Sequence, residues 1–330
     1  MNRSLLEQLA DRILLWVRSQ PKRKVEIKDL SKKFKAEPPH VKAALRILNE
    51  WGYRFFQDKN KISFVSAPDI LSTTEISHNL KTKFAGKVIN SFNMVKSTND
   101  IARQLAEKEA AEGTIITAEK QTLGKGRLGR SWYSPEKMGI YVSIILRPKF
   151  TPDKAPGLSI MSALAVAETL NEYAPKKIQI KWPNDVLINN RKVSGVLTEL
   201  SAEKNKINYV IVGIGINVKQ SENDFPSNLR ATATSLQRET GKEISRVELL
   251  KLLLVNFEKE YLRYKRDQLA KSLPRIRKLS SLLNREVSLQ WNGAAVSGTA
   301  VDIDQRGSLI IESNGDRMTV SSGEVTVVKK

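Results

Sequence analysis

The stretch "EKQTLGKGRLGRSW" (119–132) spaces its glycines as G-x-G-x-x-G. In a dinucleotide-binding fold this spacing follows a strand and opens a helix whose N-terminus receives the pyrophosphate. A strand-like run, "TIITAEKQT" (114–122), does precede the glycines, but "SWYSPEKMG" (131–139) has a proline, a glycine and no apolar period of 3.6. The spacing of a P-loop is also missing. The stretch therefore predicts a basic glycine loop whose backbone can approach an anionic ligand closely.

The sequence around this loop predicts a mixed α+β sheet. Strand-like runs lie at 86–95, 114–122, 138–148, 176–201 and 207–219, and helical patterns lie at 97–113, 157–175 and 245–269. Some strands are separated by helices and others only by short turns, which argues against a regular βαβ repeat. From about residue 275 the pattern changes to short strands, which predict a small β-barrel. Its expected turns are Asn292-Gly293, Arg306-Gly307, Asn314-Gly315 and Ser322-Gly323.

The N-terminal 65 residues have the pattern of a winged helix-turn-helix. Helical periods at 4–19, 27–37 and 40–53 are followed by two strand-like runs within 54–65. This segment holds 15 Lys and Arg against 7 Asp and Glu, a local charge of +8, which suits a surface that faces phosphates. On the third helix, Lys42 and Arg46 are the candidate DNA-binding residues. The same module can also serve dimerisation or protein contacts.

Composition excludes several kinds of chemistry. The chain has 330 residues, a net charge of +20, no cysteine and only two histidines. Disulfides, thiolate metal sites and cysteine nucleophiles are therefore excluded, and a His-rich metal site or catalytic triad is not expected. The positive charge favours an anionic partner, although a lysine-rich surface alone would also produce it. With no apolar run long enough for a membrane span and no apparent secretory signal, a cytoplasmic protein is expected.

Two further stretches combine polar residues with strand-like sequence. "KWPNDVLINNRKVSGVLTEL" (181–200) carries Lys181, Asp185 and Lys192, and such charges inside a sheet are costly unless they are paired or bind a ligand. In "GIGINV" (213–218), glycines alternate with isoleucine, which clears one face of the strand for a flat ligand. Asn217 in that stretch offers both a donor and an acceptor.

Taken together, these stretches resemble the bifunctional biotin–protein ligase and biotin operon repressor family. The matching order is "STN" (97–99), "EKQTLGKGRLGRSW" (119–132), "KWPNDVLINNRK" (181–192), "SGVLTEL" (194–200) and "GIGIN" (213–217). The resemblance implies three domains joined by one linker. These are a winged helix-turn-helix at 1–66, a linker at 67–82, a catalytic domain like a class II aminoacyl-tRNA synthetase at 83–273, and an SH3-like barrel at 274–330.

The resemblance also implies a reaction and its residues. Biotin and ATP would give biotinyl-5′-AMP, from which biotin would pass to a lysine of biotin carboxyl carrier protein. The implied catalytic residues are Arg127, Lys192 and Asp185, with Asp185 also holding Mg²⁺. The implied biotin-binding residues are Ser97, Thr98, Asn99, Gln121, Gly124, Lys125, Arg127, Lys192, Gly195 and Leu197. The implied ATP-binding residues are Arg127, Arg130, Trp132, Lys181, Asn184, Asp185, Lys192 and Asn217.

Other hypotheses stay open at the level of sequence. The family's repressor role implies operator DNA as a second partner and a homodimer linked to the bound ligand. The N-terminal domain could instead belong to a ligase that does not repress transcription. A lipoate-type ligase and a DNA-binding regulator that only senses a ligand are further alternatives. The regulator would leave the charges of Arg127, Lys192 and Asp185 without a catalytic role.

Overall fold

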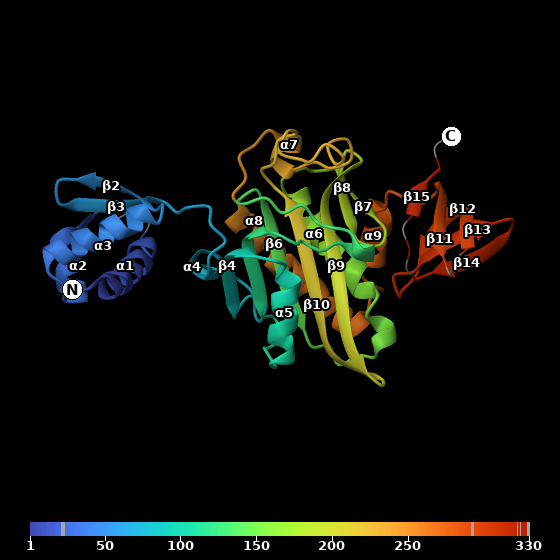
Figure 1. Ribbon diagram of the computed structural model, residues 1–330, viewed down its shortest axis with the longest axis horizontal. Helices are drawn as coiled ribbons and strands as arrows, with labels where there is room; N and C mark the ends of the chain where they lie inside the picture. Colours follow the sequence, from blue (N-terminus) through green and yellow to red (C-terminus); the bar gives the residue numbers. More distant parts are fainter. Residues whose placement is uncertain (21–23, 292–293, 322, 324, 329–330) are drawn as a thin grey trace. The chain divides into compact units, whose positions relative to one another are not determined.

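The computed structural model describes residues 1–20, 24–291, 294–321, 323 and 325–328, so the expected turns at 292–293 and 322 lie outside the described residues. The chain forms two compact units, Met1–Asp69 and Ile70–Lys330 (Figure 1). Each unit has a hydrophobic core of its own.

The first unit contains three helices and a small sheet. The elements are α1 (Arg3–Arg18), β1 (Val25–Glu26), α2 (Ile27–Phe34), α3 (Pro38–Glu50), β2 (Arg54–Asp58) and β3 (Lys61–Ser66), with the strands in the order β1-β3-β2. The three expected helices and two expected strands are present, and β1 is an addition. Helix α3 begins at Pro38 and not after the prolines, because the first turn of a helix needs no donor from them.

The second unit is built on a mixed sheet of seven strands in the order β4-β5-β6-β10-β9-β8-β7 (Figure 1). Only β4 and β5 are parallel neighbours, and the other pairs are antiparallel. The mixed α+β sheet expected from the sequence is therefore present. The strands are β4 (Ile89–Val95), β5 (Ile115–Gln121), β6 (Gly139–Leu146), β7 (Ile178–Lys181), β8 (Asp185–Ile188), β9 (Arg191–Glu203) and β10 (Lys206–Asn217).

Helix α5 (Thr98–Glu107) covers one face of the sheet, and α6 (Gly157–Asn171) and α8 (Arg246–Asp267) cover the other (Figure 1). Further helices of this unit are α4 (Thr73–Ser77), α7 (Leu236–Thr240) and α9 (Leu273–Leu279). Along β10, Val210, Val212, Ile214 and Ile216 join the large core with α6 and α8, whereas Ile211 packs in a smaller cluster with α5. Side chains alternate between the faces of a strand, so Gly213 and Gly215 lie on the face of α5.

Two expected boundaries differ from the structure. The helix expected at 97–113 ends at Glu107, because Glu109 adopts a left-handed φ of +60° and breaks the helical path before Gly113. The stretch expected as a linker, 67–82, contains α4, and Leu71 and Ile76 in it are buried in the core of the second unit. Only the residues up to Asp69 belong to the first unit, so the linker prediction is too long.

The C-terminal segment forms a five-stranded antiparallel sheet in the order β14-β13-β12-β11-β15. Its strands are β11 (Glu286–Trp291), β12 (Ala294–Ile303), β13 (Leu309–Ser313), β14 (Asp316–Val320) and β15 (Val325–Val327). This sheet shares the large core with the seven-stranded sheet, and the Trp182 indole donates a hydrogen bond of 2.7 Å to the Gly307 carbonyl. The two sheets therefore pack as one unit.

Candidate functional site

The glycine loop folds as a tight hairpin over the α5 face of the sheet. The Gly126 N–H donates to the Arg130 carbonyl at 2.7 Å, and the Trp132 N–H donates to the Gly124 carbonyl at 2.8 Å. At its tip, a 3₁₀ turn (η1, Arg127–Gly129) replaces the helix that a dinucleotide fingerprint would need. No α-helix opens at these glycines, so the loop lacks the helix N-terminus that receives a pyrophosphate in that fold.

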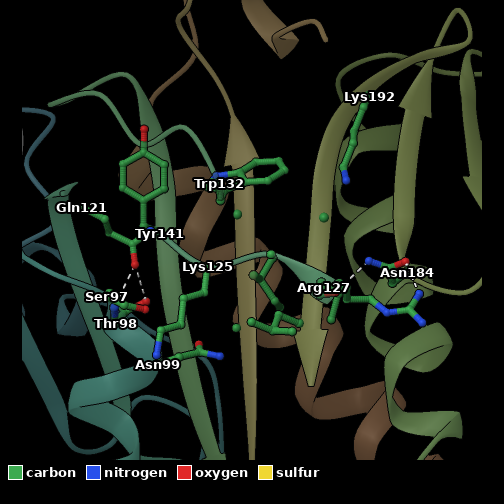
Figure 2. A pocket seen from close by; sticks show the side chains of 17 residues that line it. Ser97, Thr98, Asn99, Gln121, Lys125, Arg127, Trp132, Tyr141, Asn184 and Lys192 are labelled. Carbon is green, nitrogen blue, oxygen red and sulfur yellow. Dashed lines mark hydrogen bonds between the residues drawn. The ribbon is translucent and has the colours of Figure 1, made fainter. Parts of the chain in front are cut away.

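Two hollows adjoin this loop. The first is lined by Ser97, Thr98, Asn99, Gln121, Lys125, Gly126, Arg127, Trp132, Tyr141, Asn184, Lys192, Gly195, Val196, Leu197, Gly213, Ile214 and Gly215 (Figure 2). The second is lined by Gly126, Arg127, Leu128, Arg130, Ser131, Trp132, Tyr133, Lys181, Trp182, Pro183, Asn184, Asp185, Leu187, Asn190, Lys192, Asn217, Phe225, Leu229, Thr232, Ala233, Gly323 and Val325. They share Gly126, Arg127, Trp132, Asn184 and Lys192, so their boundary carries two cationic side chains.

A hydrogen-bonded network forms one wall of the first hollow (Figure 2). The Thr98 backbone N–H and hydroxyl both donate to Gln121 Oε1, at 2.8 and 3.1 Å, and Gln121 Nε2 donates to Ser134 Oγ at 2.9 Å. These bonds fix the orientation of the Gln121 amide. Ser97 occupies the N-cap position of α5, and its side chain makes no capping hydrogen bond.

The Asn99 side chain lines the first hollow and is also fixed by hydrogen bonds to two neighbouring side chains. Its Nδ2 donates to Glu199 Oε2 at 2.6 Å, and its Oδ1 accepts from Ser143 Oγ at 2.6 Å. Gly213 makes this position available, since a Cβ there would lie 2.2 Å from Asn99 Oδ1. The glycine thus lets α5 approach β10 closely.

Trp132 rests on a floor of two glycines from neighbouring strands. A Cβ on Gly215 of β10 would lie 2.4 Å from the indole, and a Cβ on Gly195 of β9 would lie 3.1 Å from it. These glycines face each other in the β9–β10 register. The indole N–H is buried without a hydrogen-bond partner among the described residues, so an acceptor on a ligand could satisfy it.

The two cations at the boundary have defined partners. Lys192 Nζ lies 2.8 Å from Asp185 Oδ1 and 5.5 Å from the centroid of the Trp132 ring. Arg127 donates to Asn184 Oδ1 at 2.9 Å, and Asn184 in turn donates to the Val196 carbonyl at 2.9 Å (Figure 2). One of these positive side chains comes from the loop and the other from β9, and both line the two hollows. An anion bound at the boundary would therefore lie in a positive environment.

Lys125 interacts through its side chain as well as lining the first hollow. Its ammonium group forms an ion pair with Asp100 in the first turn of α5. Asp100 also lies 3.9 Å from Arg103, whose other partner is Glu199. The Lys125 side chain is therefore held at the start of α5.

The structure brings together nearly all of the predicted residues. Every predicted biotin-binding residue except Gly124 lines the first hollow, and every predicted ATP-binding residue lines the second. Gly124 is buried beneath the loop, where a Cβ would lie 2.4 Å from the Trp132 carbonyl oxygen. Lys42 and Arg46 belong to the first unit, where both are exposed on α3.

Sequence reasoning missed several residues that line the hollows. Tyr141 lies on β6, its hydroxyl donates to the Pro135 carbonyl at 2.9 Å, and burial raises its pKa. Phe225, Leu229, Thr232 and Ala233 come from the irregular segment after β10. Gly323 and Val325 come from the C-terminal sheet. The segment after β10 has no periodicity, and only the fold brings the C-terminal residues to the site.

Two structural observations bear on the class of protein. Among the described residues, no three or more His, Asp or Glu side chains cluster as they would around a metal ion. In the same part of the chain, no helix combines the length and apolar character that crossing a membrane requires.

Comparisons with known proteins agree with the geometry. Residues 91–217 match the Biotin/lipoate A/B protein ligase family, and residues 282–328 match the Biotin protein ligase C terminal domain. The chain is 37% identical to the "Bifunctional ligase/repressor BirA" of Bacillus subtilis, over 79% of this chain and 80% of that protein. It is 33% identical to the "Biotin--[acetyl-CoA-carboxylase] ligase" of Mycobacterium tuberculosis, over 69% and 85% respectively.

A solved structure is similar over much of the chain. The biotin protein ligase from Aquifex aeolicus, in complex with biotin and ATP, has a TM-score of 0.64 and 32% identity. The match covers 74% of this chain and all of that one.

Proposed function

The chain belongs to the family of biotin–protein ligases, and on that premise we propose that it uses ATP to join biotin to a lysine of a carrier protein. The single observation that carries this proposal is the meeting of two hollows at Arg127 and Lys192. A reaction between two anions needs cations where the anions meet. The relatives named as biotin ligases, together with the match to a biotin ligase C-terminal domain, favour biotin over lipoate.

The first hollow suits biotin. Its polar wall, formed by Thr98 and Gln121 together with Ser97, suits the donors and acceptors of a ureido ring. Gly195 and Leu197 of β9 also line the first hollow, where the apolar side chain of biotin would lie. The biotin carboxylate would then point towards Arg127 and Lys192.

The second hollow suits ATP. Arg130, Lys181 and Lys192 give it a positive lining for phosphates, and Asn217 offers hydrogen bonds to the nucleotide end. Trp132 offers an aromatic face for the adenine. Mg²⁺ fits this site because that ion is commonly bound through one or two carboxylates plus substrate phosphates, and Asp185 supplies one carboxylate. When bound, the ion would reduce the charge on the phosphates.

In the first step, a biotin carboxylate oxygen attacks the α-phosphorus, and pyrophosphate leaves. Lys192 and Arg127 stabilise the negative charge that develops around the α-phosphate, which is the usual means of accelerating such a transfer. In the second step, the neutral amine of the acceptor lysine attacks the acyl carbon, AMP leaves and an amide forms. Between the steps, the hairpin over the pocket shields the acyl-adenylate from water.

We assign the finer domain identities on the same basis. The first unit would be a winged helix-turn-helix that binds operator DNA, the seven-stranded sheet a class II synthetase-like catalytic domain, and the C-terminal sheet an SH3-like barrel. Three helices with a β2–β3 hairpin support the first assignment, and relatives named ligase/repressor support a second function in transcription. A ligand-linked homodimer and a cytoplasmic location remain predictions.

The test of the ligase is transfer of label. The purified chain would be incubated with ATP, labelled biotin and a biotin carboxyl carrier domain, with labelled lipoate in a parallel reaction. We expect ATP-dependent label on the acceptor lysine from biotin and not from lipoate. A carrier whose lysine is replaced by arginine is the control. Label from lipoate alone, or no label at all, would refute the proposal.

A further inference from the structure

Glu239, on the short helix α7, lies outside both hollows and has no assigned role. We propose that it is a positioning residue that holds Lys192 in place for formation of the acyl-adenylate. The inference rests on the proposed function, because it takes the reacting phosphate as the target of Lys192.

The segment before α7 runs beside Lys192 like an additional strand. The Lys192 N–H donates to the Thr232 carbonyl at 2.7 Å, and the Thr234 N–H donates to the Lys192 carbonyl at 2.9 Å. On its other side, Lys192 is paired with Leu187 of β8. The position of the Lys192 backbone therefore depends on where the segment 232–234 lies.

Glu239 fastens that segment to the β8–β9 turn. Its carboxylate accepts hydrogen bonds from the Thr234 hydroxyl and from Asn189 Nδ2, both at 2.6 Å, and forms an ion pair with Arg191. Asn189 belongs to the turn, and Arg191 immediately precedes Lys192 in the chain. The Glu239 carboxylate thus links the segment 232–234 to the β8–β9 turn, and Lys192 lies between these two segments.

Burial makes the charge of Glu239 important. The side chain is only 4% exposed, and its carboxylate would be costly to bury without partners. Burial opposes its ionisation, but the hydrogen bonds from Thr234 and Asn189 and the Arg191 charge outweigh burial, so the pKa of Glu239 is lowered. A neutral side chain here would leave the Arg191 guanidinium without its counter-charge, next to Lys192.

Thr234 also connects this arrangement to the nucleotide end of the second hollow. Asn217 Nδ2 donates to the Thr234 carbonyl at 3.0 Å. The segment held by Glu239 therefore contacts Lys192 and Asn217, which both line that hollow. Loss of Glu239 is expected to disturb the relative placement of these two side chains more than the biotin wall formed by Gln121.

The experiment compares Glu239→Gln and Glu239→Asp with a matched control, Glu222→Gln. Glu222 also pairs with an arginine of α7, Arg238, but its side chain is 57% exposed. Single-turnover formation of biotinyl-AMP, biotin affinity and thermal unfolding would be measured. We expect Glu239→Gln to slow adenylation by about 10- to 100-fold, as supporting residues around reactive groups commonly do. Biotin affinity should change less than about threefold, and Glu222→Gln should leave all rates within about twofold.

A double-mutant cycle with Lys192→Met separates positioning from general damage. If Glu239 acts through Lys192, its substitution should slow adenylation little further once the Lys192 amine is gone. The inference would be overturned if the rate loss in the double variant equalled the product of the losses in Glu239→Gln and Lys192→Met. Normal adenylation by Glu239→Gln would also overturn it. Should Glu239→Gln not fold, Glu239→Asp takes its place in the cycle, with the same two outcomes decisive. If Lys192→Met adenylates biotin normally, the proposed role of Lys192 fails instead.

Discussion

Gly215→Ala should impair adenylation by moving Trp132. The added Cβ would lie 2.4 Å from the indole, whereas ordinary contact begins at 3.4 Å, so the ring must retreat by about 1 Å. Displacements of that size can cost about 100-fold in rate, and since the loop can relax we expect about 10- to 100-fold, or about 1.4 to 2.7 kcal/mol. The effect should fall mainly on kcat/KM for ATP, because Trp132 offers its face to the nucleotide.

The neighbouring glycine supplies a graded comparison. On Gly195, a Cβ would lie 3.1 Å from the same ring, so Gly195→Ala requires a shift of only about 0.3 Å. The assay is ATP-dependent release of pyrophosphate at saturating biotin, with thermal unfolding to verify folding. In a Trp132→Ala background, Gly215→Ala should have little further effect. The same loss with and without the indole would refute the steric argument.

Four further outcomes are expected. Arg127→Gly should release biotinyl-AMP about 10- to 100-fold faster, because a charge-assisted bond to the ligand is lost, and biotinylation of unspecific lysines should rise; unchanged release would contradict this role. Lys192→Met should slow adenylation by about 100-fold but slow transfer from added biotinyl-AMP less; equal losses in the two half-reactions would indicate a structural role. Glu260→Gln should destabilise the chain by about 2 kcal/mol in urea at pH 7, with the difference disappearing in acid. The first unit should bind DNA with a steep dependence on salt, as a gel shift at two salt concentrations would measure.

The acid dependence of the Glu260 effect follows from the direction of its pKa. Burial opposes the ionisation of Glu260, but Arg275 and Ser272 bond its carboxylate at 2.8 and 2.9 Å and, with the Arg275 and Arg263 charges, lower its pKa from 4.5. A lowered pKa in the folded state gives stability that is present above 4.5 and lost as the pH falls through the folded-state value. A difference between wild type and Glu260→Gln that grew in acid would contradict this assignment.

The sequence predicted those parts of the fold that local pattern determines. Helix α8 follows the expected 245–269 closely, since an apolar period and a Ser245 cap both mark it. The glycine loop was recognised because "SWYSPEKMG" has no helical period. The end of α5 was missed because Glu109, not a glycine, adopts the left-handed conformation. Such a departure from local preference depends on tertiary packing, which a single sequence does not display.

In the candidate site, too, local sequence predicts some features and tertiary packing determines the others. Residues close together in sequence, such as Lys181 and Asp185, could be grouped from their spacing. Glu239 could not, because 47 positions separate it from Lys192 and only the folded segment 232–234 joins them. The resemblance implies that Trp132 binds ATP, yet its fit on Gly215 depends on the pairing of β9 with β10. The sequence thus indicates which groups carry the chemistry, and the fold shows what holds them.

DNA binding by the first unit can be separated from general attraction by its charge. Lys42 and Arg46 are exposed and four residues apart on α3, so they share one face, while Val41, Leu45 and Leu48 bury another face in the core of the unit. If both cations contact phosphates, Lys42→Ala with Arg46→Ala should reduce the slope of log affinity against log salt by about 2. The control, Lys204→Ala with Lys206→Ala, removes the same charge from exposed positions in the second unit. Equal changes in the two double variants would mean that net charge alone attracts the DNA. A loss confined to the α3 pair would mean that this helix faces the duplex, as a repressor requires.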